Sequence, residues 1–374
     1  VKDDHIPDIA VQRWVVEGAG LPVVDTQLMH LNRECRAPDL SNLFERSPVD
    51  ERVLEALPTV GPEVEAQLTM LEGELPDVPI GDHCTKPYDC PFLARCWPVL
   101  PEHHISTIAR LSPRKRSALT ALGVETIDRI PANFELTEIQ ARQVRAVKDG
   151  KPVIEPELKT ELIQFEGARL AFIDFETVGL PIPVWDGCHP YDAVPVQVSV
   201  DVTEGRRDAG SEVARHFEWI ASDATDPRPM IAAKVVEACR GADVVVAFNA
   251  GFERKCLELL AEAVPEHAGA INGIIGKLKD LADPVRKGIY HPGFYGSYSL
   301  KNVVPALVPE LAYDDLEVAE GTTASTKLAA LMFEPEKFTP EERDRTRRQL
   351  LDYCGRDTLV MVRLLDLLRG LARA

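Results

Sequence analysis

The sequence lacks any apolar run that could cross a membrane. A transmembrane helix needs about 18 or more consecutive apolar residues, and no stretch of this 374-residue chain approaches that length. No signal peptide is visible, so we expect a cytoplasmic protein with no membrane partner. Internal repeats and low-complexity segments are also absent. What is present is an ordinary globular composition, 45% hydrophobic and 27% charged, in a chain long enough for two or three domains.

Positive charge is also scarce. The chain has 42 Lys and Arg residues against 60 Asp and Glu residues, a formal net charge of -18. This deficit argues against a protein that coats nucleic acid through bulk electrostatics. It does not exclude a nuclease, because part of the acidic charge can belong to a metal site. Basic clusters at 114–116 and at Arg142, Arg145 and Lys148 could follow a phosphate backbone, although a solvated helix face is the commoner explanation.

Two acidic residues stand at the end of an apolar stretch near the middle of the chain. Asp174 and Glu176 follow Leu170-Ala171-Phe172-Ile173, and residues two apart on a strand point to the same face. Carboxylates in that position pack poorly but are good ligands for hard cations. The sequence therefore predicts a metal-binding pair at the end of a central strand.

Two later segments supply groups of the same chemistry. Glu253 follows a second apolar strand, 244–246, at the start of an expected helix, while Tyr353 and Asp357 are four apart in a long helical stretch and so share one face. Each pattern alone is common. The three in this order favour a site for two Mg²⁺ or Mn²⁺ ions, about 3.5–4 Å apart, that cleaves phosphodiesters. Tyr353 would orient the attacking water or help to deprotonate it.

These segments resemble the motifs of the DEDD superfamily of 3′–5′ exonucleases, in the variant with tyrosine in the third motif. The resemblance implies an RNase H-like fold and a two-metal exonuclease with Asp174, Glu176, Glu253 and Asp357 as ligands. The superfamily usually has Asp where Glu253 stands; the extra methylene keeps the charge and shifts the oxygens, and we interpret it as a tolerated variation. More narrowly, residues 166–374 resemble the bacterial domain of unknown function DUF2779. The segments that carry this are Asp174-Phe175-Glu176-Thr177, Phe248-Asn249-Ala250-Gly251-Phe252-Glu253, Tyr298-Ser299-Leu300-Lys301 and Tyr353-Cys354-Gly355-Arg356-Asp357-Thr358.

The chain has eight cysteines. In a protein expected to be cytoplasmic, we interpret them as metal ligands or buried thiols rather than disulfides. Cys84, Cys90 and Cys96 lie in a proline-punctuated segment, and soft thiolates in such a pattern select zinc or an iron–sulfur cluster. A complete site needs a fourth ligand, for which Cys35 and His83 are candidates. The other cysteines are interpreted as small buried hydrophobes: Cys188, Cys239, Cys256 and Cys354.

Residues 1–100 resemble the second half of a RecB/Cas4-like nuclease of the PD-(D/E)xK class. Gln12 matches the helical glutamine that follows the catalytic strand in those enzymes, and their iron–sulfur cluster takes three cysteines from the carboxyl-terminal end. The resemblance implies a 4Fe–4S cluster on Cys84, Cys90 and Cys96 in an intact parent protein. Because the chain opens at Val1 in what resembles the middle of an element, we expect a fragment whose first nuclease is incompetent and whose cluster is not filled.

Residues 101–165 are expected to form a helical connector. The stretch 105–122 is helix-like with a break near Pro113, and 122–130 resembles a helix-hairpin-helix-like element, which presents backbone amides to phosphates. A plain helical linker fits the same pattern.

From residue 166 onward we predict an α/β domain with a mixed sheet flanked by helices, preceded by a partial restriction-endonuclease-like α/β domain in 1–100. The aromatic residues of 290–296 could stack the bases of a single strand over the active site or pack beneath their own loop. Strands are expected near 168–175, 194–202, 213–219 and 243–248, and helices near 228–240, 251–263, 268–281 and 340–370.

The leading hypothesis is a metal-dependent 3′–5′ exonuclease of single-stranded DNA or RNA; no motif distinguishes the two. Asn249 would fix the second-motif loop or the terminal nucleotide, and Lys301 would contact a substrate phosphate. The alternatives are a nucleic-acid-binding or assembly module whose site has drifted, and a cluster-containing redox or structural protein.

Overall fold

The computed structural model describes residues 1–374 except 87, 98, 167–168, 205–211, 319 and 374. The chain divides into two compact units: residues 1–100 with 181–191, and residues 101–180 with 192–374. Within the described residues, no helix is both long enough and apolar enough to span a membrane.

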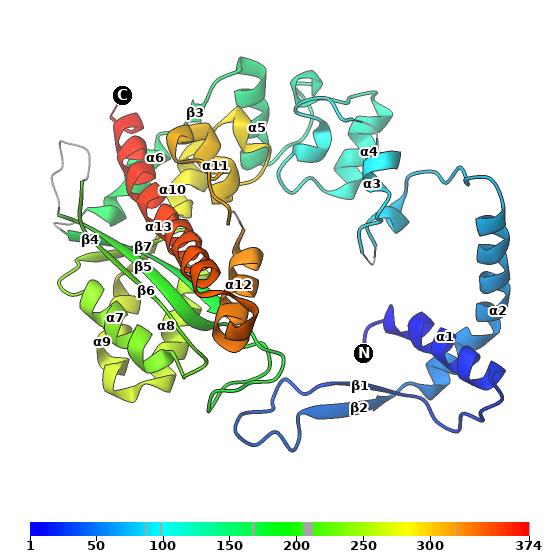
Figure 1. The fold of residues 1–374 in the computed structure, drawn as a ribbon. Helices are drawn as coiled ribbons and strands as arrows, with labels where there is room; N and C mark the ends of the chain where they lie inside the picture. The colour runs from blue at the N-terminus through cyan, green and yellow to red at the C-terminus, as the bar shows by residue number, and fades with distance from the viewer. Residues whose placement is uncertain (87, 98, 167–168, 205–211, 319, 374) are drawn as a thin grey trace. The chain divides into compact units, whose positions relative to one another are not determined.

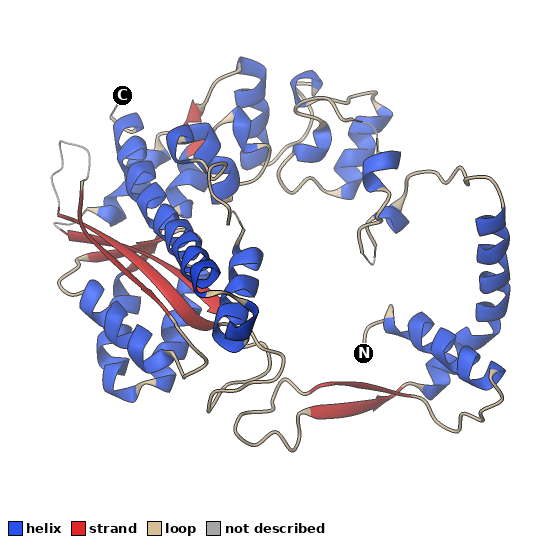
Figure 2. Ribbon diagram, viewed as in Figure 1, coloured by secondary structure: helices blue, strands red, loops and turns tan. Residues whose placement is uncertain are grey.

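The first unit combines two helices with a two-stranded sheet (Figure 2). α1 (His5–Gly18) and α2 (Asp50–Glu72) pack around an apolar cluster that includes Ile6, Ala10 and Val53. β1 (Gln27–Leu31) and β2 (Phe44–Pro48) form an antiparallel pair. The cysteine segment contains only short elements, the turn η1 (Asp82–Cys84) and α3 (Leu93–Cys96). The restriction-endonuclease-like assignment of this unit stays a prediction.

The second unit is built on a five-stranded sheet of order β6-β5-β4-β7-β8. β4 is the middle strand; it pairs antiparallel with β5 and parallel with β7, and β8 runs parallel to β7. The sheet is therefore mixed, as predicted. The strands are β4 (Arg169–Val178), β5 (Val194–Glu204), β6 (Val213–Ile220), β7 (Val244–Ala247) and β8 (Leu278–Asp280).

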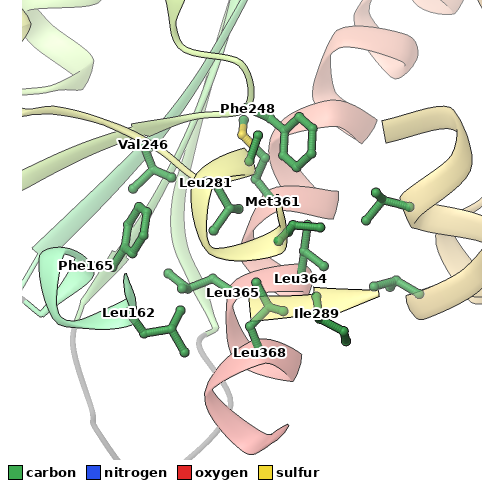
Figure 3. Packing of buried hydrophobic residues seen from close by; sticks show 14 of the residues in the cluster. Leu162, Phe165, Val246, Phe248, Leu281, Ile289, Met361, Leu364, Leu365 and Leu368 are labelled. Carbon is green, nitrogen blue, oxygen red and sulfur yellow. The ribbon is translucent and has the colours of Figure 1, made fainter. Parts of the chain in front are cut away.

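Helices cover both faces of this sheet (Figure 1). Side chains alternate along β4, so Ala171 and Ile173 pack into one core with α7–α9, while Leu170 and Phe172 pack into a second core with α13. Figure 3 shows the second core, in which Leu364, Leu365 and Leu368 of α13 meet β7 and the neighbouring helices. The bounds are α7 (Arg228–Ala238), α8 (Gly251–Ala263), α9 (Pro265–Lys277), α10 (Ala282–Gly288), α11 (Leu300–Leu307), α12 (Gly321–Phe333) and α13 (Pro340–Leu371).

Helix α13 has clear local reasons to begin where it does. Pro340 occupies the first turn, where its missing N–H costs nothing, and Thr339 and Glu342 form a reciprocal capping box. The helix then runs for 32 residues, because its apolar stripe stays buried against the sheet. Its middle carries the third motif.

Residues 101–165 pack within the second unit. Their bounds are η2 (Ile105–Thr107), α4 (Pro113–Ala121), η3 (Ile127–Arg129), α5 (Glu138–Asp149), β3 (Val153–Ile154), α6 (Glu157–Leu162) and η4 (Ile163–Phe165). β3 pairs with β9 (Ile289–Tyr290), which precedes the turn η5 (Pro292–Phe294). The remaining turns of the unit are η6 (Pro309–Leu311) and η7 (Pro335–Lys337).

Most of the predicted elements are present, and two predictions were wrong in part. The stretch 105–122 is one turn plus α4, which starts at Pro113 because Ser112 caps it and proline suits the first turn. The helix expected over 268–281 ends at Lys277, since residues 278–280 join the sheet beside β7. Residue 168, where the first strand was expected to begin, lies outside the described residues.

Candidate metal centre

The first motif lies on the central strand β4. By the alternation described above, Asp174 and Glu176 point to the same side as Phe172, toward α13. Glu176 is buried and Asp174 is half-buried. Both carboxylates are thus held by a strand that has an apolar core on each face, which fixes their backbone positions.

The third motif lies on α13 and reaches the same place. Oxygens of Asp174, Glu176 and Asp357 all lie within 4.8 Å of one another. Within the described part of the chain, this is the one group of three His, Cys, Asp or Glu residues with ligand atoms so close together. The structure therefore assembles three of the four predicted carboxylates from segments about 180 residues apart.

The second motif supplies Glu253 in the first turn of α8. Its carboxylate is buried, and its Oε2 atom has no hydrogen-bond partner among the described residues. It is outside the close group of three, yet its charge raises the pKa of both Asp174 and Glu176. Glu253 thus lies beside the group of three, and its buried Oε2 atom is an unpaired oxygen close to other carboxylates.

Burial and mutual repulsion dominate the electrostatics of this centre. Burial raises the pKa of Asp174 well above its usual range, and the neighbouring carboxylates raise it further. Burial likewise raises the pKa of Glu176 and of Glu253 to about 8. It raises the pKa of Asp357 to about 6, against the lowering effects of a Tyr313 hydrogen bond and of nearby Lys301 and Arg356. Such a cluster favours a counter-charge, and carboxylate oxygens are suited to Mg²⁺ or Mn²⁺.

Tyr353 and Asp357 share one face of α13, as predicted, and Tyr353 is buried with only 7% of its surface exposed. A second tyrosine, which the sequence analysis missed, lies beside it. The Tyr313 hydroxyl donates to Asp357 Oδ1, and the centroids of the Tyr313 and Tyr353 rings are 6.2 Å apart. Tyr313 belongs to a loop with no motif of its own, so the sequence offered no signal for it.

Cys354 is not merely a small hydrophobe, which corrects our interpretation. Its thiol donates to Asp174 Oδ2 at 3.2 Å. The thiol is fully buried, and burial raises its pKa well above the ordinary value. A neutral thiol can donate one hydrogen bond to a carboxylate, so Cys354 helps to orient Asp174.

A buried polar network, also missed, anchors α13 to β5 beside the centre. Asp201, 3% exposed, accepts hydrogen bonds from the Thr358 hydroxyl at 2.9 Å and from His216 Nδ1 at 2.7 Å. The hydrogen bond to Asp201 raises the pKa of His216. Ser199 lies 3.0 Å from the same hydroxyl. Because Thr358 directly follows Asp357, this network fixes the turn of α13 that carries the third-motif carboxylate.

Asn249 fixes the second-motif loop, the first of its two predicted roles. Its backbone has a left-handed φ of 62°, which asparagine tolerates better than most residues. Its N–H donates to Asp280 Oδ1 at 2.8 Å, and its side-chain oxygen accepts from Arg286. The predicted contact of Asn249 with a terminal nucleotide stays a prediction. Lys301 is half in solvent and pairs with Glu320 at 3.3 Å.

The aromatic segment after β9 mostly packs beneath its own loop. The rings of Tyr290, Phe294 and Tyr298 meet edge to face at centroid distances of 5.4–5.9 Å. Gly296 has a φ of 81°, and a Cβ there would lie 1.9 Å from the carbonyl oxygen of Thr107. Only Tyr295 of this group is exposed, and it stacks on a histidine ring.

The basic cluster of α5 has structural partners. Arg142 is buried and bonds to Glu155 at 3.0 Å and to the carbonyl of Arg286 at 2.8 Å. Lys148 donates to the carbonyl of Ile130. Arg142 is therefore a packing residue and not part of a solvated face, whereas Arg145 and Lys148 are exposed, as a solvated helix face predicts.

Among the residues that the structure describes, the cysteines of this segment do not form a close ligand group. Cys84 is buried, Cys90 is half-buried and Cys96 is exposed, and Pro87 and Pro98 of this segment lie outside the described residues. Cys35 is buried, with its thiol 3.6 Å from the Asp39 carbonyl. Gln12 donates to Asp8 along α1. The iron–sulfur assignment and the role of Gln12 stay predictions.

Residues 171–299 match the model of a family described as a domain of unknown function, DUF2779. The matched range contains the first and second motifs and ends before the third. This supports the DUF2779 resemblance over that range, although the family's description assigns no activity. No curated protein matches the chain.

Proposed function

We propose that residues 166–374 form a divalent-cation-dependent 3′–5′ exonuclease with an RNase H-like sheet, acting on single-stranded DNA or RNA. The observation that carries this proposal is the acidic centre. Oxygens of Asp174, Glu176 and Asp357 lie within 4.8 Å of one another. The mixed sheet, with the first motif on its middle strand, agrees with the fold that the resemblance implies.

The donor set fits Mg²⁺ or Mn²⁺. All four predicted ligands are hard carboxylates, and the unpaired Glu253 Oε2 offers a further oxygen beside the group. Bound divalent cations would supply Lewis-acid activation of a phosphoryl oxygen and a water that loses its proton more readily. The chain's own contribution is to hold the carboxylates in place through β4, α8 and α13.

The other residues of the site have positioning roles in this proposal. Tyr353 presents its hydroxyl from the same face of α13 as Asp357 and would orient the attacking water. Cys354 orients Asp174. Asn249, held by Asp280 and Arg286, fixes the loop that precedes Glu253. The 3′–5′ direction rests on the resemblance to the exonuclease superfamily.

The experiment that tests this function uses 3′- and 5′-labelled single-stranded DNA and RNA with Mn²⁺, Mg²⁺ or EDTA. We expect stepwise shortening from the 3′ end that requires a divalent cation. Asp174→Asn should lower the rate at least about a thousandfold. The matched control is Asp352→Asn, an exposed carboxylate next to Tyr353 on the same helix, which should cleave at the wild-type rate. Equal rates for wild type and Asp174→Asn would refute the assignment.

One observation favours a second candidate, a drifted module that binds nucleic acid without cleaving it. Glu253 replaces the usual aspartate, and its oxygens are not part of the close group of three. Binding of a single strand without cleavage under either metal would support this candidate. Recovery of cleavage in Glu253→Asp would then identify the extra methylene as the cause.

A further inference from the structure

An acidic loop reaches the metal centre from between η6 and α12. Residues 312–320 contain four carboxylates and no basic side chain. We consider residues 312–318 and Glu320, and call them the acidic loop. The negative charge of this loop would be repelled by the acidic centre alone. Cations beside the centre are therefore needed to hold the loop in place.

The acidic loop pairs with cations that flank the centre. Asp315 holds the Arg356 guanidinium in a bidentate arrangement, with oxygen–nitrogen distances of 3.1 and 2.9 Å, and Arg356 also donates to the Ala312 carbonyl at 2.9 Å. Glu320 pairs with Lys301 at 3.3 Å. Tyr313 of the same loop donates to Asp357. Three points of this loop are thus tied to residues in or beside the site.

Arg356 and Lys301 are tied to the centre by the acidic loop. The loop that pairs with both cations also donates from Tyr313 to Asp357, a proposed ligand of the centre. Arg356 directly precedes Asp357 on α13, and Lys301 lies in the first turn of α11. A guanidinium that binds a carboxylate in bidentate fashion offers the same geometry to a phosphate, and a lysine ammonium binds phosphate as a point charge.

We propose that Arg356 and Lys301 bind backbone phosphates of the nucleic-acid strand that enters the metal centre. Asp315 and Glu320 form ion pairs with these two cations until the phosphates displace them. This rests on the proposed function and names the regulation of the same site. The exchange conserves charge, because two phosphates take the place of two carboxylates.

The loop contacts are suited to exchange. The side chains of Asp315 and Glu320 are both 63% exposed, and that of Lys301 is 52% exposed. An exposed pair such as Glu320–Lys301 contributes little net stability, whereas the bidentate Asp315–Arg356 pair, in which the Arg356 side chain is 19% exposed, is the stronger of the two. A nucleic-acid strand that binds the metal centre at the same time can therefore displace the two loop carboxylates. Single carboxylates or inorganic phosphate in solution lack that second attachment.

Binding of fluorescein-labelled single-stranded DNA and RNA oligonucleotides tests this proposal, with Ca²⁺ as the divalent cation so that affinity is measured apart from Mg²⁺-supported cleavage. The variant Asp315→Asn/Glu320→Gln should lower Kd roughly fivefold to tenfold, as two competing ion pairs are removed. The matched control, Asp314→Asn/Glu310→Gln, removes the same charge from exposed neighbours that make no side-chain hydrogen bond or ion pair within the described part of the chain. It should stay within about twofold of wild type.

Removal of the cations completes the test. Lys301→Gln should weaken binding and reduce the gain of the loop variant, and Lys301→Gln/Arg356→Gln, if it keeps the wild-type Tm, should abolish that gain. Hydrogen exchange of residues 312–318 should rise when an oligonucleotide binds. Equal Kd values for the loop variant and its charge-matched control, or unchanged binding in Lys301→Gln, would overturn the proposal.

The two proposals can fail separately. If the loop variant binds more tightly while no preparation cleaves, the loop exchange stands and the exonuclease assignment falls. If Asp174-dependent cleavage is seen while the loop variant behaves like its control, the exonuclease stands and the loop exchange falls. If no form of the protein binds a single strand, both fall.

Discussion

The acidic centre and the cysteine segment are both sets of metal-ligand residues, and they are held in opposite ways. The carboxylates sit on β4 and α13, elements that are buried on the sheet core, and three of them converge to within 4.8 Å. Cys84 lies in a short turn, Cys90 in a loop and Cys96 in a four-residue helix, and they are buried, half-buried and exposed, respectively. Ligands on long packed elements can be arranged before a metal arrives, whereas ligands on short loops commonly depend on the metal for their order.

Among residues that are not proposed metal ligands, the largest effect should come from the hydroxyl of Tyr353. In Tyr353→Phe the ring still fills its place in the core, so we expect unchanged Tm and a fall in kcat of roughly a hundredfold or more, the lower end of the range for loss of one group that positions or transfers a proton. The Mn²⁺ concentration that gives half-maximal rate should not change, because no ligand is lost. A shift in that concentration with kcat intact would show that Tyr353 acts through the metal ligands instead.

The buried network behind α13 should carry the next largest effect. Asp201→Asn leaves the volume unchanged but weakens hydrogen bonds from His216 and Thr358 in a buried site, so we expect a loss of about 1–3 kcal/mol in the free energy of unfolding. The His216 pKa, followed by NMR, should fall toward its ordinary value. Glu218→Gln is the matched control, since Glu218 contacts the other ring nitrogen at 3.3 Å from an exposed position; it should cost less than about 0.5 kcal/mol.

The metal-free protein should lose stability as pH rises. Burial raises the pKa of Glu176 and of Glu253 to about 8, above the value of about 4.3 for glutamate in an unfolded chain. Between these values the folded state binds more protons than the unfolded state, so the free energy of unfolding falls with increasing pH. Tm in EDTA should therefore decrease from pH 5 to pH 8, and Mn²⁺ should restore it by binding the folded state. A flat Tm over this range would contradict the raised pKa values. Glu176→Gln/Glu253→Gln should reduce the slope.

The cysteines should have the smallest effect on hydrolysis. Cys90→Ser/Cys96→Ser leaves the acidic centre untouched, so we expect wild-type cleavage rates and wild-type Mn²⁺ dependence. Anaerobic purification gives the second readout, because a cluster absorbs near 400 nm and the serine variant would lose that absorbance. A large loss of cleavage in this variant would show that the two ligand sets are coupled.

The sequence revealed those parts of the site that local pattern encodes. A two-residue repeat on an apolar strand placed Asp174 with Glu176, and a four-residue interval on a helix placed Tyr353 with Asp357. The bounds of α8 and α13 also followed from local signals, in α13 from a proline and a capping box. These features depend on residues that are close to one another in the sequence, so the sequence alone predicts them.

The remaining features depend on contacts between distant segments. Tyr313 reaches Asp357 from a loop 44 residues away, and Asp201 meets Thr358 across 157 residues. Tyr313 has no periodic or motif-like setting, and the alternating pattern of β5 assigns Asp201 to one face of the sheet without revealing its partner on α13. The helix expected over 268–281 failed for the same reason: Leu278 and its two successors become a strand because β7 offers them a parallel partner, which no local propensity reports.

Mn²⁺ binding, counted by electron paramagnetic resonance, tests the central claim most directly because it requires no choice of substrate. We predict that the wild-type chain binds two Mn²⁺ ions that are magnetically coupled at the separation of about 3.5–4 Å typical of two-metal sites. Asp174→Asn should lose the coupled pair, whereas the helix-matched control Asp352→Asn should keep it. No bound Mn²⁺ in the wild type, or the same coupled pair in Asp174→Asn, would contradict the assignment of this acidic centre as a two-metal site.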